Sequence, residues 1–310
     1  MSKAMYPAVG GITRAGKAAY AVLSGLTHKI KAGYAVRDGV NRQFFSAGPQ
    51  VVYSGTHTIT DVMVSGMACK LYTLTGSGTL TVAGEDVRYW MCGGGAGGGT
   101  GIISDATSFG GRGGGGGYST SGTLVTGEYV VQIASGGQAD TDGADTICGN
   151  IKARGGNANG NGGSGGGAQV CAGYHASAST TEKWTEAAGT GTGVSTYPFG
   201  LSGLYPHCAG GASASAFSKL RNSATSYRIY GCDGGSNGEN GSNTAHTTPD
   251  APSGGIKGGG NGAISGNGGN GTFYGAGAGG GYAYRSVNNK STGTGGAGYQ
   301  GVAYVLVPAA

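Results

Sequence analysis

Residues 258–281 read GGGNGAISGNGGNGTFYGAGAGGG, and this stretch limits the chain to very few folds. Divided into threes, it gives one column of small residues from Gly260 to Gly281 and a second column that is small apart from Tyr274. The third column carries most of the larger side chains, which are Asn261, Ile264, Asn267, Asn270 and Phe273. Two small columns beside one column with side chains are typical of a helix with three residues per turn, the polyproline-II type.

Glycine makes up 73 of the 310 residues, and it loses more conformational freedom on folding than any other residue. A Gly/Ser/Asn-rich segment is by default a flexible linker. We expect bundled polyglycine-II helices instead, in which adjacent extended segments satisfy one another's N–H and C=O groups and small residues line the contacts. The alternative is a set of irregular glycine-rich loops attached to a β-sheet.

The rest of the chain predicts an all-β or irregular fold, because no segment has the pattern of an amphipathic helix. Residues 51–91 alternate apolar and polar positions and break at glycine-containing turns, which indicates β-strands. A further β-like run covers 122–137. The strand Val87–Cys92 leads into the glycine region and GYQGVAYVLVP, residues 298–308, closes it. We expect these two strands to bracket the glycine region, and to be able to pair and join its ends.

The first fifty residues contain a weak repeat of about 14 residues that predicts short β-hairpins rather than helices. They carry seven Lys/Arg and one acidic residue, whereas residues 51–310 carry twelve Lys/Arg and thirteen acidic residues. We therefore expect three regions: a basic β-repeat attachment segment (1–50), a β-strand connector (51–92) and a glycine-rich domain (93–310) with display loops at 172–232 and 242–253. The local basic charge indicates solvation or docking to an acidic partner rather than nucleic-acid binding.

The N-terminus lacks the apolar core of a signal peptide, and no run is long and apolar enough to span a membrane. We expect synthesis in the cytoplasm and no membrane insertion. The six cysteines are widely spaced with no CxxC pair. We interpret them as reduced, buried small apolar residues, with later oxidation left open.

Motifs for chemistry are weak. Matches to G-x-S-x-G and G-x-G-x-x-G arise from glycine content and lack the strand–turn–helix context that these motifs need. Asp140, Asp142 and Asp145 are a weak Ca²⁺ candidate, and an Asp-rich turn is the alternative. His175, His207 and Cys208 lack zinc-ligand spacing. The sequence predicts neither a catalytic residue nor a cofactor.

An aromatic-rich insertion at 172–232 is the best candidate for binding. Side chains with flat apolar faces and polar edges suit stacking on sugar rings or on a protein loop. The candidate receptor-binding residues are Trp184, Tyr197, Phe199, Tyr205 and His207. The alternative is that they form a small local core that caps the bundle.

Three stretches together resemble the glycine-rich domain of bacteriophage tail and tail-fibre proteins: SGTLTVAGEDVRYWMCGGGAGGG, GGRGGGGGYSTSGTLVTGEYVVQIASGG and GTGGAGYQGVAYVLV. The resemblance spans about residues 70–307 and lies in the order of strands and glycine clusters. THKIKAGYAVRDGVNRQFF is similar to short segments of tail proteins from phages and prophages of Gram-positive hosts. The family usually has a valine-rich strand leading into the glycine cluster, and this chain has Trp90, Met91 and Cys92 there instead. The insertion at 172–232 matches no pattern of the family.

The resemblance implies a virion structural protein of the tail-fibre type, an adhesin that displays loops for host-surface receptor recognition and is not an enzyme. The expected partners are further copies of the chain in a homo-oligomer, most plausibly a trimer, other virion proteins through 1–50, and a host cell-surface protein or glycan. Two alternatives remain: a self-associating decoration or filament protein, and an ice-binding protein. The ice-binding alternative ranks last, because the third column of the stretch 258–281 lacks a regular array of Thr or Ala.

Overall fold

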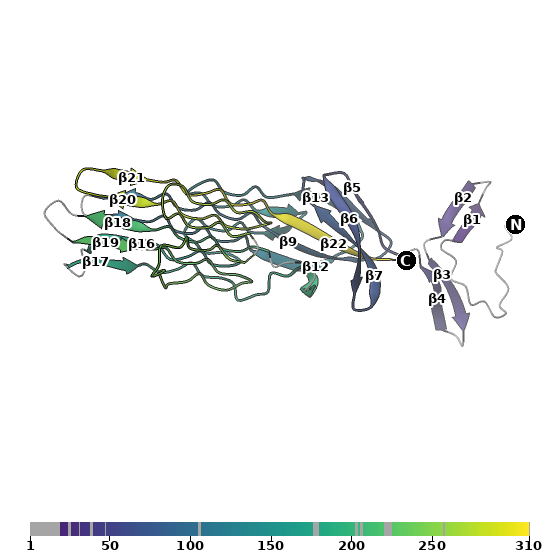
Figure 1. The fold of residues 1–310 in the computed structure, drawn as a ribbon. Helices are drawn as coiled ribbons and strands as arrows, with labels where there is room; N and C mark the ends of the chain where they lie inside the picture. Colours follow the sequence, from purple (N-terminus) through teal and green to yellow (C-terminus); the bar gives the residue numbers. More distant parts are fainter. Residues whose placement is uncertain are drawn as a thin grey trace.

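The computed structural model is all-β and elongated, with sheets at both ends of a middle section built from extended segments (Figure 1). We call these parts the base, the shaft and the tip. The only helix among the described residues is the single-turn 3₁₀ helix η1 (Pro198–Gly200), so no described helix could cross a membrane. The structure describes residues 19–23, 26–30, 32–37, 40–46, 48–104, 107–175, 180–201, 204, 207–219, 225–256 and 258–309.

Two short hairpins precede the base. Each lies within the predicted basic segment, and strand β3 begins 13 residues after β1, close to the repeat of the sequence. The pairs are β1 (Ala19–Leu23) with β2 (Leu26–Ile30), and β3 (Ala32–Arg37) with β4 (Val40–Ser46). The prediction of hairpins in this segment is therefore confirmed.

The base is a sandwich of two five-stranded antiparallel sheets. In order across the first sheet, the strands are β12 (Ser119–Leu124), β9 (Val87–Cys92), β22 (Val302–Pro308), β7 (Met67–Leu74) and β6 (His57–Val64). In order across the second sheet, they are β15 (Ile151–Ala153), β14 (Thr146–Cys148), β13 (Gly127–Gln132), β8 (Gly78–Ala83) and β5 (Gln50–Tyr53). Both sheets draw strands from either side of residue 92, so the expected domain boundary there falls inside the sandwich.

Strand β22 explains why VAYVLV is apolar without alternation. It lies between β9 and β7, which confirms that the two strands bracketing the glycine region pair. Its residues Ala303, Val305 and Val307 pack inside the sandwich against β8 and β13, while Tyr304 and Leu306 pack on the outer face of the sheet. A strand that is buried on both faces reads as a continuous apolar run.

The tip consists of two four-stranded sheets that pack over a small core of alanine and valine side chains. The first contains β10 (Ile102–Ile103), β11 (Thr107–Phe109), β16 (Val170–His175) and β17 (Thr180–Thr185). The second contains β19 (Ser226–Ile229), β18 (Ala216–Lys219), β20 (Ala283–Arg285) and β21 (Lys290–Thr292). Ala216 of β18 and Ile229 of β19 contribute to the tip core, and β18 runs parallel to β20.

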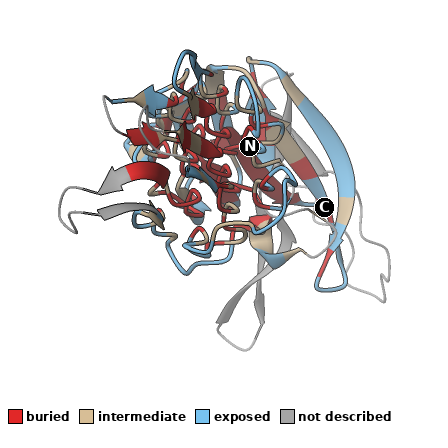
Figure 2. Cartoon of the chain, turned by 60° about the vertical axis from the view of Figure 1, so that its left-hand side comes forward, coloured by how far each residue is buried: buried red, intermediate tan, exposed pale blue. Residues whose placement is uncertain are grey.

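The shaft is made of the connections between base and tip, and these are the glycine tracts (Figure 1). They run outward and back, and buried residues fill the interior of the bundle while exposed residues cover its outside (Figure 2). The glycine tracts are residues 93–101, 110–118, 155–168, 209–215, 258–282 and 293–301.

Hydrogen bonds between the glycine tracts repeat every three residues. From the tract 93–101, the N–H groups of residues 93, 96 and 99 donate to the carbonyls of 118, 115 and 112 in one neighbouring tract. The N–H groups of 95, 98 and 101 donate to those of 299, 296 and 293 in a second neighbour. A third set, from 94 and 97, reaches the carbonyls of 144 and 141. This tract thus bonds to three neighbouring segments in turn.

Three residues per turn is the repeat of a polyproline-II-type helix. The repeat also explains how a shaft with few large side chains holds together, because the buried backbone groups find partners in adjacent tracts. The assignment of the tracts as polyglycine-II helices stays a prediction, to which this repeat adds support.

The six cysteines are all buried and unpaired, as the sequence predicts. They lie in strands or at the ends of tracts, where they fill the core as small apolar side chains. Burial raises the pKa of the Cys148 thiol to about 11 and that of Cys171 to about 12. These thiols are therefore held in the protonated, unreactive form at neutral pH.

Candidate functional site

The structure does not bring the predicted receptor-binding residues together. Trp184 lies in β17 at the tip, half-buried, with its ring edge-on to Phe109 at 6.4 Å between centroids. Tyr197 and Phe199 lie at η1, which packs on the outer face of the base sheet. Arg88 sits 5.3 Å from the centroid of the Phe199 ring. Tyr205 lies outside the described residues.

His207 is buried against the outer face of the first base sheet, with only 1% of its surface exposed. Its Nε2 is 2.8 Å from the hydroxyl of Tyr304. The centroid of its ring lies 5.1 Å from that of Trp90 and 5.9 Å from that of Tyr274, on which it stacks. Burial raises the pKa of Tyr304 well above its usual value. Part of the predicted aromatic surface is thus a local core that fixes η1 to the base.

Trp184 instead lines a hollow at the tip, which we call the aromatic hollow. It has a volume of about 490 Å³ and lies between β17, β19 and the loop that follows residue 242. The two predicted display loops, 172–232 and 242–253, meet here. Its lining residues are Lys183, Trp184, Thr185, Arg228, Ile229, Tyr230, Asn243, Thr244, Ala245, His246 and Thr247.

The aromatic hollow combines flat rings with hydrogen-bonding groups. Trp184 and Tyr230 are both half-buried, so each leaves part of a ring accessible while its base is held by the fold. His246 is fixed by Asp233, with Nε2 and Oδ1 2.8 Å apart. Aromatic faces beside amide, hydroxyl and cationic groups are suited to a sugar or to a polar protein loop.

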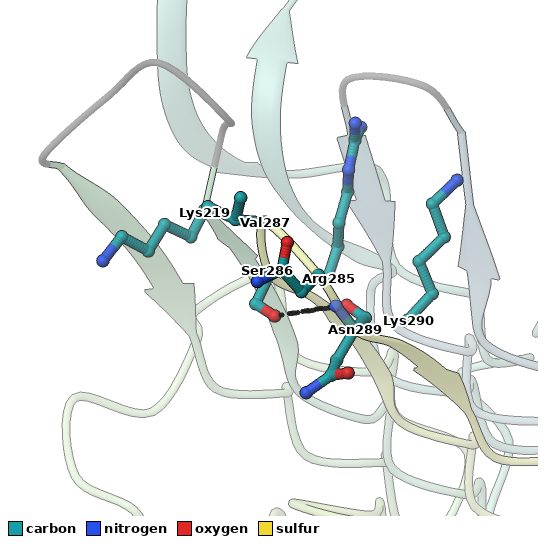
Figure 3. Close-up of a pocket in the computed structure, with 7 residues that line it drawn as sticks. Lys219, Arg285, Ser286, Val287, Asn289 and Lys290 are labelled. Carbon is teal, nitrogen blue, oxygen red and sulfur yellow. Dashed lines mark hydrogen bonds between the residues drawn. The ribbon is translucent and has the colours of Figure 1, made fainter.

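A second hollow at the tip was missed by sequence reasoning. This basic hollow, of about 510 Å³, surrounds the turn between β20 and β21 and is lined by Lys219, Arg285, Ser286, Val287, Asn288, Asn289 and Lys290 (Figure 3). Its cations come from segments more than sixty residues apart: Lys219 lies in the predicted display loop 172–232, whereas Arg285 and Lys290 lie in a part of the chain that the sequence pattern assigned to the scaffold. The pairing of β18 with β20, which joins them, follows from the tertiary fold alone.

Each carboxylate of the Asp-rich turn has a different partner. Asp140 Oδ1 accepts from the N–H of Thr100 at 2.8 Å, and Asp142 Oδ1 accepts from the N–H of Ala158 at 2.6 Å. Asp145 pairs with Lys152 at 2.7 Å, and its hydrogen bond with Lys152 keeps the pKa of that carboxyl below its usual value. Within the described part of the chain, no three His, Cys, Asp or Glu side chains gather around a point that could hold a metal ion.

The remaining zinc candidates lie apart. His207 and Cys208 are in the base, whereas the backbone of His175 ends strand β16 at the tip. Comparison with known proteins adds no assignment: no protein-family model matches the chain, and no curated protein matches it.

Proposed function

We propose that this chain is a phage virion structural protein of the tail-fibre type, an adhesin that acts by binding and not by catalysis. The observation that carries the proposal is the placement of both hollows. Both are lined by residues of the tip sheets and their loops. These sheets lie at the opposite end of the shaft from the base sandwich that holds the C-terminal strand β22 (Figure 1). A rigid spacer between an attachment end and a displayed end suits a receptor-binding fibre.

The aromatic hollow is the proposed receptor site. Binding sites commonly lie on connections that a rigid scaffold displays, and half-buried Trp and Tyr side chains give contact area at low entropic cost. Trp184 and Tyr230 supply these side chains, and the fixed His246 supplies a polar edge. The receptor class stays a host cell-surface protein or glycan, and the location stays the virion.

Attachment of the purified chain to host cells tests this proposal. We expect W184A/Y230A to lower attachment at least tenfold while the melting temperature stays within a few degrees, because both rings are partly exposed. The matched control is Tyr299→Ala, which removes an aromatic ring that is 38% exposed on the shaft. Equal attachment by the double variant and the control would contradict the site.

Self-association is the second candidate role, and a feature of the base favours it. Strand β6 is a sheet edge in the described fold and exposes Ile59 and Met63, next to the exposed Met67 of β7. An apolar edge of this kind is a ready template for pairing with another copy. We propose that copies associate through the base, in the expected homo-oligomer, and imaging of intact particles separates a few distal copies from a continuous array.

A further inference from the structure

The tip concentrates positive charge. The segments that form its two sheets and the loops within them, residues 102–109, 170–185, 216–229 and 283–292, contain six Lys/Arg and two acidic residues, a formal charge of +4. Residues 51–310 as a whole carry a formal charge of −1. The charge of the base and shaft is therefore negative, and the end farthest from the base is positive.

Within the basic hollow, two cations face each other across a strand pair. Arg285 of β20 is directly opposite Lys290 of β21, and Figure 3 shows both side chains extending to the same side of the hairpin. Like charges directly opposite each other in an antiparallel pair destabilise it. Among the described residues, no ion pair joins either cation to another side chain, and the one hydrogen bond of the Arg285 guanidinium goes to the Ser104 carbonyl, at 3.1 Å.

The hairpin is nevertheless well fixed. The Ser286 N–H donates to the Asn289 carbonyl at 2.7 Å, and the Asn289 N–H donates to the Ser286 hydroxyl at 3.1 Å. The rings of Phe217 and Tyr284 stack at 4.8 Å and hold β20 against β18. Lys219 ends β18 and extends to the other side of the turn from Arg285 and Lys290 (Figure 3).

From this geometry we propose that the basic hollow binds phosphate groups of an anionic surface polymer, an inference that rests on the proposed adhesin function and names a ligand class for it. A phosphate between Arg285 and Lys290 removes the repulsion between them, and a guanidinium matches phosphate oxygens in a planar fork. Lys219 binds a second phosphate group of the same polymer, on the other side of the turn. Cations on both sides of the turn suit a repeating chain better than a single ion.

Binding of purified full-length protein to immobilised sodium polyphosphate tests the inference. We expect binding that weakens as salt rises, because exposed charges are screened over about 8 Å at physiological ionic strength. Lys290→Gln is expected to weaken binding at least tenfold and Lys219→Gln several-fold. The matched control, Lys70→Gln, removes the same charge from the base and is expected to leave binding unchanged.

A stability measurement separates a binding site from a misfolded tip. Lys290→Glu places an acid opposite Arg285, so it is expected to raise the melting temperature while it abolishes polyphosphate binding. No binding by the unchanged protein, or equal losses in Lys290→Gln and Lys70→Gln, would overturn the inference. Tighter binding to phosphatidylglycerol vesicles than to polyphosphate would overturn the assignment to a polymer.

Failure of the inference and failure of the proposed function give different results. Polyphosphate binding is measured without cells, so its loss in Lys290→Gln establishes the anion site whatever W184A/Y230A does to attachment. If W184A/Y230A lowers attachment and the protein does not bind polyphosphate, the adhesin proposal stands and the ligand class is wrong.

Discussion

At Gly98 the shaft has room for a hydrogen atom and nothing larger. A Cβ built there would lie 2.0 Å from the carbonyl oxygen of Gly279, and one at Gly211 would lie 1.8 Å from that of Ala278. Both contacts are with backbone, which cannot rotate away. Close approach of the tracts therefore requires glycine at these positions, and the same approach allows the backbone hydrogen bonds between tracts.

Substitution of Gly98 tests this steric requirement. We expect Gly98→Ala to lower the free energy of unfolding by about 3 kcal/mol, because neighbouring tracts must separate. Gly127→Ala is the matched control, since its nearest neighbour would be the Tyr129 side chain at 3.7 Å, and it should change stability by less than about 1 kcal/mol. Chemical denaturation measures both, and similar losses would argue against tight packing of the tracts.

Asparagine side chains take the place of a tract at the edge of the bundle. Asn267 and Asn270, from the third column of the opening stretch, accept from the N–H groups of Thr294 and Ala297 at 3.0 and 2.8 Å. Asn240 and Asn237 accept in the same way from Gly191 and Thr196. Because these asparagines are three residues apart, their side-chain amides lie along one side of a tract. There they accept the hydrogen bonds that a further tract would otherwise accept.

Replacing Asn270 tests this edge role. Asn270→Ala leaves the Ala297 N–H without its acceptor, so we expect a loss of about 1 kcal/mol in the free energy of unfolding. Asn270→Asp keeps an acceptor oxygen in place and should retain most of that stability. The idea fails if denaturation curves show the two variants to be equally destabilised.

At the scale of elements, strand positions were predictable and their neighbours were not. Alternation and turn glycines located β5 to β9, and the apolar run at the end of the chain located β22 and its pairing with β9. Strands β12 to β15 complete the same sandwich after an excursion to the tip, which no local pattern encodes. The sequence therefore placed a boundary at residue 92 where the sheets have none.

The candidate site was predictable only in part for the same reason. The sequence indicated Trp184 and the two display loops that line the aromatic hollow. It could not tell that His207 and Phe199 pack on the base, because an aromatic residue in an irregular segment has the same sequence signal whether it is displayed or buried. Arg285 and Lys290 carried no signal beyond their charge.

Buried thiols in both sandwiches make stability depend on alkaline pH. The thiol of Cys148 in β14 has an ordinary pKa of 9.0 that burial raises to about 11, and burial raises that of Cys232 to about 11. Between pH 9 and 11 the unfolded chain therefore releases protons that the folded chain keeps. The free energy of unfolding falls as pH rises, by about 1.4 kcal/mol per pH unit for each thiol.

Thermal denaturation at several pH values checks this dependence. We expect these thiols to leave the melting temperature unchanged below pH 9 and to lower it as the pH rises above 9. Cys148→Ala lowers stability at every pH because it leaves a cavity, but it should make the fall between pH 9 and 11 shallower. A slope unchanged by the substitution would show that the Cys148 thiol does not titrate in this way.

At the scale of the whole molecule, one arrangement connects composition to the proposed function. Two small sandwiches with ordinary apolar cores close the ends of a shaft whose interior is largely backbone and small side chains. The shaft gives length without large side chains, and it keeps the two hollows at a fixed distance from the base. Glycine is abundant because the shaft consists of the connecting tracts themselves, and these can pack closely only where side chains are absent or small.

Hydrogen–deuterium exchange of the intact protein tests this arrangement most directly. The account predicts that most amides in 93–101, 110–118 and 275–281 exchange as slowly as those of β9 and β22, because most of them donate to a carbonyl of a neighbouring segment and open only with the sandwiches. Complete exchange of these peptides within seconds, while β9 and β22 stay protected, would mean that the tracts are loose connections and would contradict the shaft.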